Sequence, residues 1–258
     1  MSTKHRSKVI AYAVEFQRAV KAAIAIAGKE PNDIIQFRFD LSDQWMSVCA
    51  RNEDDKIFLA ADVGINYLDL DYERDAVVEV SVASARIFSA MAMKPSDSED
   101  DPLVGLFISD DIIVRTDESG LGLNLRRAQV HRANHPAQGS VLGDVAGVVD
   151  RWDERTSIEN GGVLLSPRQI KRVGAVAAAM EEPLTVTGVV ERQADKVGWV
   201  TADGKMVRLR AVAAKTPADE MPTENTPGRQ HDSFEDDYVA AVKSAGSRVV
   251  QARPLRSV

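Results

Sequence analysis

The chain has 258 residues, of which 44% are hydrophobic and 28% are charged, and 39 acidic against 32 basic residues give a net charge of −7. This length allows a sizeable core and two domains. The negative charge argues against binding polyanions over the whole surface, yet it permits a local basic patch because salt screens each charge beyond about 10 Å. The lone Cys49 excludes an internal disulfide and CxxC zinc sites.

The sequence shows no sign of a membrane protein. No apolar run approaches the length of about 20 residues that a membrane span needs. The N-terminal stretch MSTKHRSK lacks the hydrophobic core of a signal peptide. Together with the single cysteine, this favours a cytoplasmic protein with no membrane partner.

The first 75 residues predict a strand, a helix and three further strands. An apolar, β-prone stretch over 9–14 precedes a segment over 15–28 with apolar residues at helical spacing. Strands are predicted over 34–42, 45–52 and 56–63, and polar residues supply the turns between them.

The same order of elements recurs twice. The second copy predicts a strand over 76–82, a helix over 83–93 and strands over 103–109, 111–118 and 121–130. The third predicts a strand over 161–166, a helix over 167–180 and strands over 184–192, 195–203 and 206–213. A module of about 60 residues thus appears three times, and repeats of this kind pack side by side.

These repeats divide the chain into regions. We expect one domain over 8–132, made of the half-modules 8–75 and 76–132, then a connector over 133–160 and a third half-module over 161–214. The tail over 215–258 begins with a proline-rich polar stretch that predicts disorder. Within the tail, 234–251 has the apolar spacing of one amphipathic helix.

The three predicted helices are poor in carboxylates. The windows 16–29, 84–94 and 167–180 hold eight Lys and Arg residues and no Asp or Glu. Chance is one explanation, since Lys and Arg are common at solvent-facing helix positions. Glu suits helices as well as Lys does, however, so its absence favours a functional explanation. A cation-bearing helix face without acids suits a polyanion held through its phosphates, with no base-specific contacts.

The repeated strand–helix–three-strand module resembles the DNA sliding clamps, the polymerase processivity factors, over about 8–213. The resemblance is closer to the bacterial polymerase III β type. SVLGDVAGVVDRWDE followed by VLLSPRQIKRVGAVAAA resembles the transition between β-clamp domains, and GKMVRLRAVA resembles the closing strand. The chain departs from the family in having Leu142-Gly143-Asp144 where an aromatic residue and Pro precede the Asp, and in lacking Pro in the last strand.

The resemblance implies an α+β fold with the helices on one face and antiparallel sheets on the other. It implies a non-enzymatic ring of several copies that encloses duplex DNA, tethers a DNA polymerase and is opened by a clamp loader. Family rings hold twelve half-modules, so three per chain imply a tetramer; a fourth, degenerate copy within 131–160 would imply a trimer. A compact clamp of the kind a bacteriophage carries would fit. The helix residues matched to the DNA-facing side are Arg18, Lys21, Arg86, Arg168, Lys171 and Arg172, with Arg126 and Arg127 as weaker candidates.

The resemblance also implies a hydrophobic pocket for partner proteins between the connector and the last strand. The residues matched to this pocket are Leu142, Val145, Val148, Val149 and Trp152, with Val207, Leu209 and Arg210. The alternative is that these apolar residues only cap the core of the third half-module.

No residue pattern indicates catalysis, and we expect no catalytic residue, metal or cofactor. His131 and His135 have metal-ligand spacing, but no third ligand is near them in the sequence. The carboxylates within 69–75 and 97–101 leave a metal-dependent nuclease as one alternative function. A second alternative is a clamp-like structural or host-interaction protein that does not form a ring. Ser166-Pro167 suits the start of a helix better than a nucleophile.

Overall fold

Three strand–helix–three-strand units follow one another along the chain. The computed structural model describes residues 6–29, 33–40, 44–91, 101–118, 127–135, 139–150, 158–160, 163–191 and 197–215, all within the unit Met1–Thr216. The second unit, Pro217–Val258, includes the predicted helix over 234–251 and lies outside the described residues.

Each of the three half-modules has the predicted order of elements. Half-module 1 comprises β1 (Ser7–Tyr12), α1 (Ala13–Ile26), β2 (Ile34–Asp40), β3 (Trp45–Asn52) and β4 (Ile57–Asp69). Half-module 2 comprises β5 (Val77–Ser81), α3 (Val82–Ala90), β6 (Leu103–Ile108), β7 (Ile112–Asp117) and β8 (Arg127–His131), and α2 (Tyr72–Asp75) precedes it. Half-module 3 comprises β10 (Val163–Leu164), α5 (Pro167–Met180), β11 (Thr185–Glu191), β12 (Val197–Asp203) and β13 (Val207–Lys215). The connector contains α4 (Val145–Asp150) and β9 (Ile158–Asn160).

Antiparallel strand pairs join the three half-modules. β1 pairs with β6, and β5 pairs with β2, so half-modules 1 and 2 exchange contacts reciprocally. Half-module 3 joins half-module 1 through β4 and β13, with Val207 opposite Ala61 and Ala211 opposite Ile57. Strand β4 connects this joint to the first strand of half-module 1, because its first half pairs with β3 and β13 while its second half pairs with β1.

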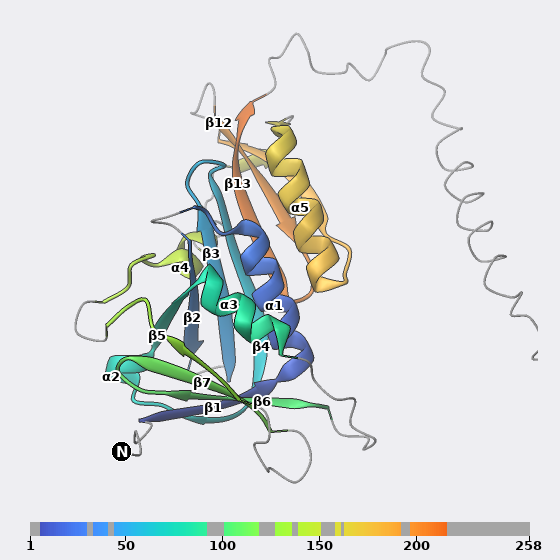
Figure 1. Ribbon diagram of the computed structural model, residues 1–258. Helices are drawn as coiled ribbons and strands as arrows, with labels where there is room; N and C mark the ends of the chain where they lie inside the picture. Colours follow the sequence, from blue (N-terminus) through green and yellow to red (C-terminus); the bar gives the residue numbers. More distant parts are fainter. Residues whose placement is uncertain are drawn as a thin grey trace, which may run out of the picture. The chain divides into compact units, whose positions relative to one another are not determined.

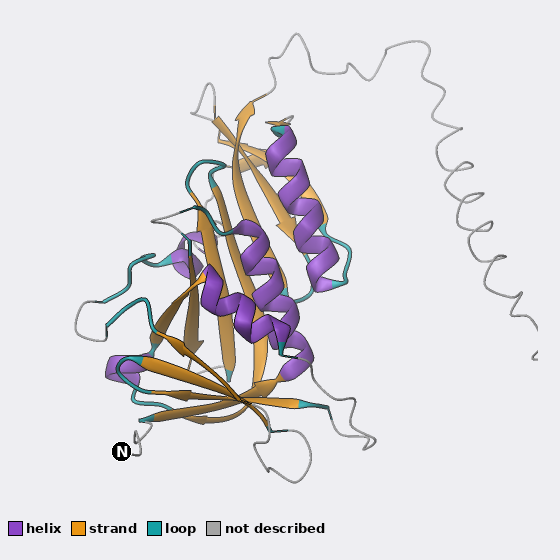
Figure 2. Ribbon diagram, in the orientation of Figure 1, coloured by secondary structure: helices purple, strands orange, loops and turns teal. Residues whose placement is uncertain are grey.

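The three long helices lie on the same side of the strands, with α1 between α3 and α5 (Figure 1). Their apolar residues, such as Phe16, Phe88 and Val176, form one buried cluster with alternate strand residues such as Leu59 and Leu209. Alternation follows from the pleat, which turns successive side chains to opposite faces. Figure 2 shows the resulting layers of helices and strands. The predicted α+β fold with its threefold repeat is confirmed.

Local sequence explains where two of these helices begin. The Ser166 hydroxyl accepts a hydrogen bond from the Gln169 N–H, the Gln169 side chain accepts one from the Ser166 N–H, and Pro167 occupies the first turn of α5. Ser81 caps α3 by accepting from the Ser84 N–H. Among the described residues, no helix is both long and apolar enough to span a membrane.

Candidate nucleic-acid interface

The helix layer exposes cations from all three half-modules. Lys21 on α1, Arg86 on α3, and Arg168 and Lys171 on α5 are exposed. Helices α3 and α5 contain no acid, and the single acid of α1, Glu15, accepts a hydrogen bond from the Gly64 N–H. These exposed cations can therefore attract phosphates without competition from free carboxylates on the same helices.

Arg18 makes a contact between helices that the sequence does not indicate. Its guanidinium forms an ion pair with Glu181, at the C-terminal end of α5, and thus bridges α1 to α5. Both side chains are partly exposed, so Arg18 remains accessible while its net charge is offset by its partner.

Arg172 is committed more strongly to the structure. Its Nε donates to Asp55 Oδ2 at 2.5 Å, and its Nη1 donates to the carbonyl oxygens of Ala25 at 2.6 Å and Ile26 at 3.1 Å. A cation at the last carbonyls of a helix satisfies groups that have no partner within the helix. Arg172 therefore joins the end of α1 to the start of α5.

A hollow of about 410 Å³ lies beside Arg172, between the C-terminal end of α1 and the N-terminal half of α5. Arg168 and Lys171 line it with Lys29, a cation of the acid-free windows that is not among the residues matched to the DNA-facing side. Asp54 and Asp55 of the β3–β4 turn also line the hollow. The signal for Lys29 was its place directly after Gly28, where α1 was expected to end.

The opposite face of the strands holds the connector. Leu142, Val145 and Val149 pack with Ile34 and Cys49 in a second buried cluster, separate from the main core. Burial raises the pKa of the Cys49 thiol to about 12. Val148 is partly exposed, and Trp152 lies outside the described residues.

The described residues of the predicted pocket fall into separate groups in the structure. Val207 and Leu209 belong to the main core on the helix side of β13, whereas the connector packs on the other side. Arg210 is buried and forms an ion pair with Asp203. Because successive residues of a strand face opposite ways, β13 turns Val207 and Leu209 to the helix side and Arg208 to the connector side.

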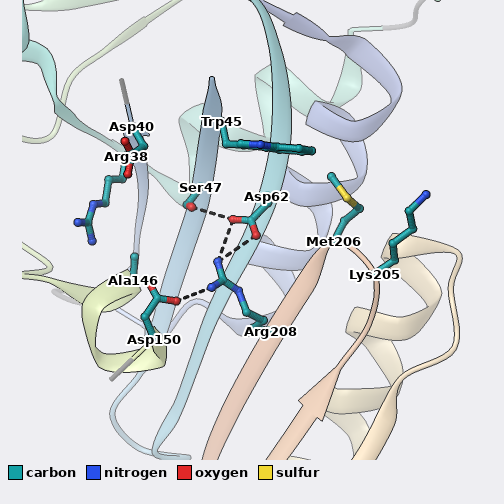
Figure 3. A pocket seen from close by; sticks show the side chains of 10 residues that line it. All are labelled: Arg38, Asp40, Trp45, Ser47, Asp62, Ala146, Asp150, Lys205, Met206 and Arg208. Atoms are coloured by element: carbon teal, nitrogen blue, oxygen red, sulfur yellow. Dashed lines mark hydrogen bonds and ion pairs between the residues drawn. The ribbon is translucent and has the colours of Figure 1, made fainter. Parts of the chain in front are cut away.

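The connector side of β13 does border a hollow of about 360 Å³. Arg208 lies between Asp62, at 2.9 and 3.1 Å, and Asp150 of α4, at 2.5 Å (Figure 3). The Ser47 hydroxyl donates to Asp62 at 2.8 Å. Figure 3 shows Trp45 and Met206 at one side of the hollow and Ala146 at the other. This hollow combines a charged floor with an exposed aromatic ring.

Two carboxylates of the acidic stretch over 69–75, Asp71 and Asp75, form ion pairs. Asp75 is fully buried between Arg6, at 2.5 Å, and Arg132, at 2.7 Å, and Asp71 also pairs with Arg6. Within the described ranges, no group of three or more His, Cys, Asp or Glu side chains could hold a metal ion. Of the second acidic stretch, 97–101, only Asp101 is described.

Solved structures with the same fold are bacterial sliding clamps. The β subunit of DNA polymerase III from Thermotoga maritima has a TM-score of 0.53 and 13% identity, over 82% of this chain and 65% of that chain. The Pseudomonas aeruginosa clamp bound to griselimycin has a TM-score of 0.51 and 10% identity, over 84% of this chain and 68% of that one. The Bacillus subtilis clamp has a TM-score of 0.50 and 7% identity, over 83% and 65%.

At the sequence level, no protein-family model and no curated protein matches this chain. The chain spans about two thirds of the length of the three clamps compared above. The likeness lies in the arrangement of helices and strands, and the predicted resemblance is confirmed at that level: this chain has the fold of the DNA sliding clamps.

Proposed function

We propose that the chain is a non-enzymatic sliding clamp. Several copies close into a ring around duplex DNA and tether a DNA polymerase, and a clamp loader opens the ring. The observation that carries this proposal is the single helix layer, in which α1, α3 and α5 expose Lys21, Arg86, Arg168 and Lys171 on one side of the sheets. Phosphate contacts of this kind carry no sequence information, which suits sliding.

The chemistry of a clamp is topological. A ring that encloses DNA stays bound without strong individual contacts, so a small number of cations per chain is sufficient. An ordinary DNA-binding protein would need a larger basic surface than a chain with net charge −7 provides.

The test compares retention on circular and linearised plasmid, with a clamp loader added where loading requires it. A clamp remains on the circle and leaves linear DNA over its free ends. An open clamp-like binder would be retained equally on both, and a nuclease would degrade the DNA when magnesium is added. Either of these two results would contradict the proposal.

Charge reversal tests the helix layer directly. The triple variant Lys21→Glu, Arg86→Glu and Arg168→Glu takes one exposed cation from each helix and should lower retention on circles at least about tenfold. The control variant Lys8→Glu, Lys56→Glu and Arg74→Glu changes the net charge equally at exposed or partly exposed sites outside these helices and outside the hollow of Figure 3. Equal losses in the two variants would show that the helix layer does not face the DNA.

We propose that the hollow of Figure 3 receives a partner protein such as the polymerase. The exposed Trp45 ring beside Met206 offers an apolar anchor site, and Lys205 offers a cation for an acidic group of the partner. Trp45→Ala should weaken polymerase binding while retention of the clamp itself on circular DNA stays unchanged.

A further inference from the structure

Half-modules 1 and 2 cover each other through a reciprocal joint. The first strand of each pairs with the second strand of the other: β1 with β6, and β5 with β2. The helices α1 and α3 pack against each other at this joint, where Gln17 Nε2 donates to the Ser89 carbonyl oxygen at 2.8 Å. Each half-module therefore contributes two strand edges and one helix face.

Half-module 3 has the corresponding strand edges, and in the described part of the chain they remain largely unpaired. Its first strand, β10, pairs only with β13. Its second strand, β11, pairs with β9 only over Val189–Glu191, so Thr185–Gly188 pair on one side alone, with β12. The first five residues of β2, Ile34–Arg38, and the whole of β6, Leu103–Ile108, make the reciprocal joint. The free segment of β11 therefore lies where the other two second strands are paired.

The exposure of residues on α5 also indicates an uncovered face. The helices align on their N-caps, Tyr12, Ser81 and Ser166, which makes Ile170 equivalent to Phe16 and Ala85. Phe16 and Ala85 are 0% exposed, whereas Ile170 is 57% exposed. Half-module 2 covers Phe16 through the Arg115 guanidinium, 5.6 Å from the centre of the ring.

Two neighbouring positions follow the same pattern. Pro167 is exposed, although the equivalent Ala13 and Val82 are buried. Gly174 is exposed, although the equivalent Val20 is fully buried. Pro167 lies one turn before Ile170 and Gly174 lies one turn after it, so the three residues share a face of α5. On the adjoining strand β11, Val186 is 51% exposed.

We propose that this bare side of half-module 3 binds half-module 3 of a second copy of the chain. The joint is reciprocal, so a partner must offer both a free first strand and a free second strand. In half-modules 1 and 2 these strands already pair with each other. Half-module 3 of another copy supplies both, and two copies then form one complete domain around a twofold axis.

This joint rests on the homo-oligomeric assembly proposed above and determines its parity. A twofold joint uses the bare side of each chain once, so copies associate in pairs. The assembly then contains an even number of chains, as the tetramer does and the trimer does not.

The test measures the mass of the full chain in solution without DNA, by sedimentation velocity. Ile170→Asp should raise the dissociation constant of the pairwise joint at least about tenfold, because the joint would bury two unpaired carboxylates. Ile87→Asp on α3 is the matched control, since Ile87 is an exposed isoleucine, 51% against 57%, outside the proposed joint. Gly174→Glu should also block association without unfolding the chain, because a side chain at Gly174 meets no atom within 4 Å and Glu favours a helix more than Gly.

The expected result is a wild-type mass that is an even multiple of 28.1 kDa, reduced by Ile170→Asp and by Gly174→Glu but retained by Ile87→Asp. At a concentration at which both proteins are monomeric, Gly174→Glu should not have a lower melting temperature than the wild type. A monomeric or trimeric wild type, or an unchanged mass in both joint variants, would overturn the proposal. Failure of the DNA proposal would instead show as loss of the difference between circular and linear plasmid in a protein that still pairs.

Discussion

Arg172 shows how a single side chain can belong to a candidate interface and still act mainly inside the fold. Its guanidinium lies between α1, α5 and the β3–β4 turn, and it donates to one carboxylate and two backbone carbonyls. Lys171, the next residue along α5, is exposed. Adjacent cations on α5 therefore differ in their contacts: Arg172 joins two helices, whereas Lys171 remains available to phosphates.

This division predicts different effects on stability. Arg172→Ala should lower the free energy of unfolding by about 1–3 kcal/mol, because Asp55 and the carbonyls of Ala25 and Ile26 lose a charged donor. Arg172→Lys should recover little, since an ammonium group cannot replace the planar guanidinium at three acceptors. Urea unfolding of these variants measures the effect. Lys171→Ala is the control and should stay within about 0.5 kcal/mol of wild type; equal losses at the two positions would contradict the assignment.

Charge and periodicity allowed part of the site to be predicted from the sequence. The acid-free windows identified the helices whose exposed cations lie in one layer, because side chains with no apolar partner stay in solvent. The ion pair of Arg18 with Glu181 could not be predicted, since it joins residues 163 positions apart that meet only when α1 packs on α5. The separation of Val207 from Val145 could not be read from the sequence, because the pairing partners of β13, and hence its inward face, depend on tertiary structure.

Among the elements, the order of the strands can be predicted from the sequence, whereas the end of a strand such as β4 cannot. Apolar alternation predicted β2, β3 and the rest of the repeat to within a few residues. β4 runs to Asp69, however, six residues beyond the predicted end at 63. Its second half pairs with β1 and includes the exposed Tyr67, so tertiary pairing rather than apolar alternation sets its length.

The connector is held at its start by one buried carboxylate. Glu79 of β5 is fully buried and accepts hydrogen bonds from the Ser140 hydroxyl at 2.5 Å, the Val141 N–H at 2.7 Å and the Leu142 N–H at 2.9 Å. Gln36 Nε2 donates to it from β2 at 3.0 Å. These bonds fix the segment that leads into α4, and α4 supplies Asp150 and Ala146 to the hollow of Figure 3.

Removing this anchor should loosen the connector before it unfolds the protein. Glu79→Ala should speed amide hydrogen exchange over 140–150 at least about tenfold, since three donors lose their shared acceptor. Exchange in α1 should change much less. Glu73→Ala, at an exposed position on α2, is the matched control. An unchanged exchange rate over 140–150 in Glu79→Ala would show that the α4 packing alone holds the connector.

The whole molecule combines two kinds of joint that alternate along the chain. Half-modules 1 and 2 meet first strand to second strand, and half-modules 1 and 3 meet last strand to last strand through β4 and β13. The edge of β8, the last strand of half-module 2, pairs only with β7 among the described strands. A ring built from this chain would continue the alternation, with β8 meeting a last strand and half-module 3 meeting its counterpart.

A closed ring separates affinity from retention, and salt distinguishes the two. Phosphate contacts weaken steeply with ionic strength because binding releases counterions, so affinity for a short linear duplex should fall at least about tenfold between 50 and 200 mM salt. Release from a closed circle requires a joint between copies to open, and the proposed joint of half-module 3 consists of strand pairing and apolar contacts around Ile170 and Val186, which this change in salt affects little. Retention on preloaded circles should therefore change less than about twofold over that range. Linearising the circles with a restriction enzyme at either salt concentration should release the protein, and loss from intact circles in parallel with the duplex affinity would mean that the bound state is held by charge alone.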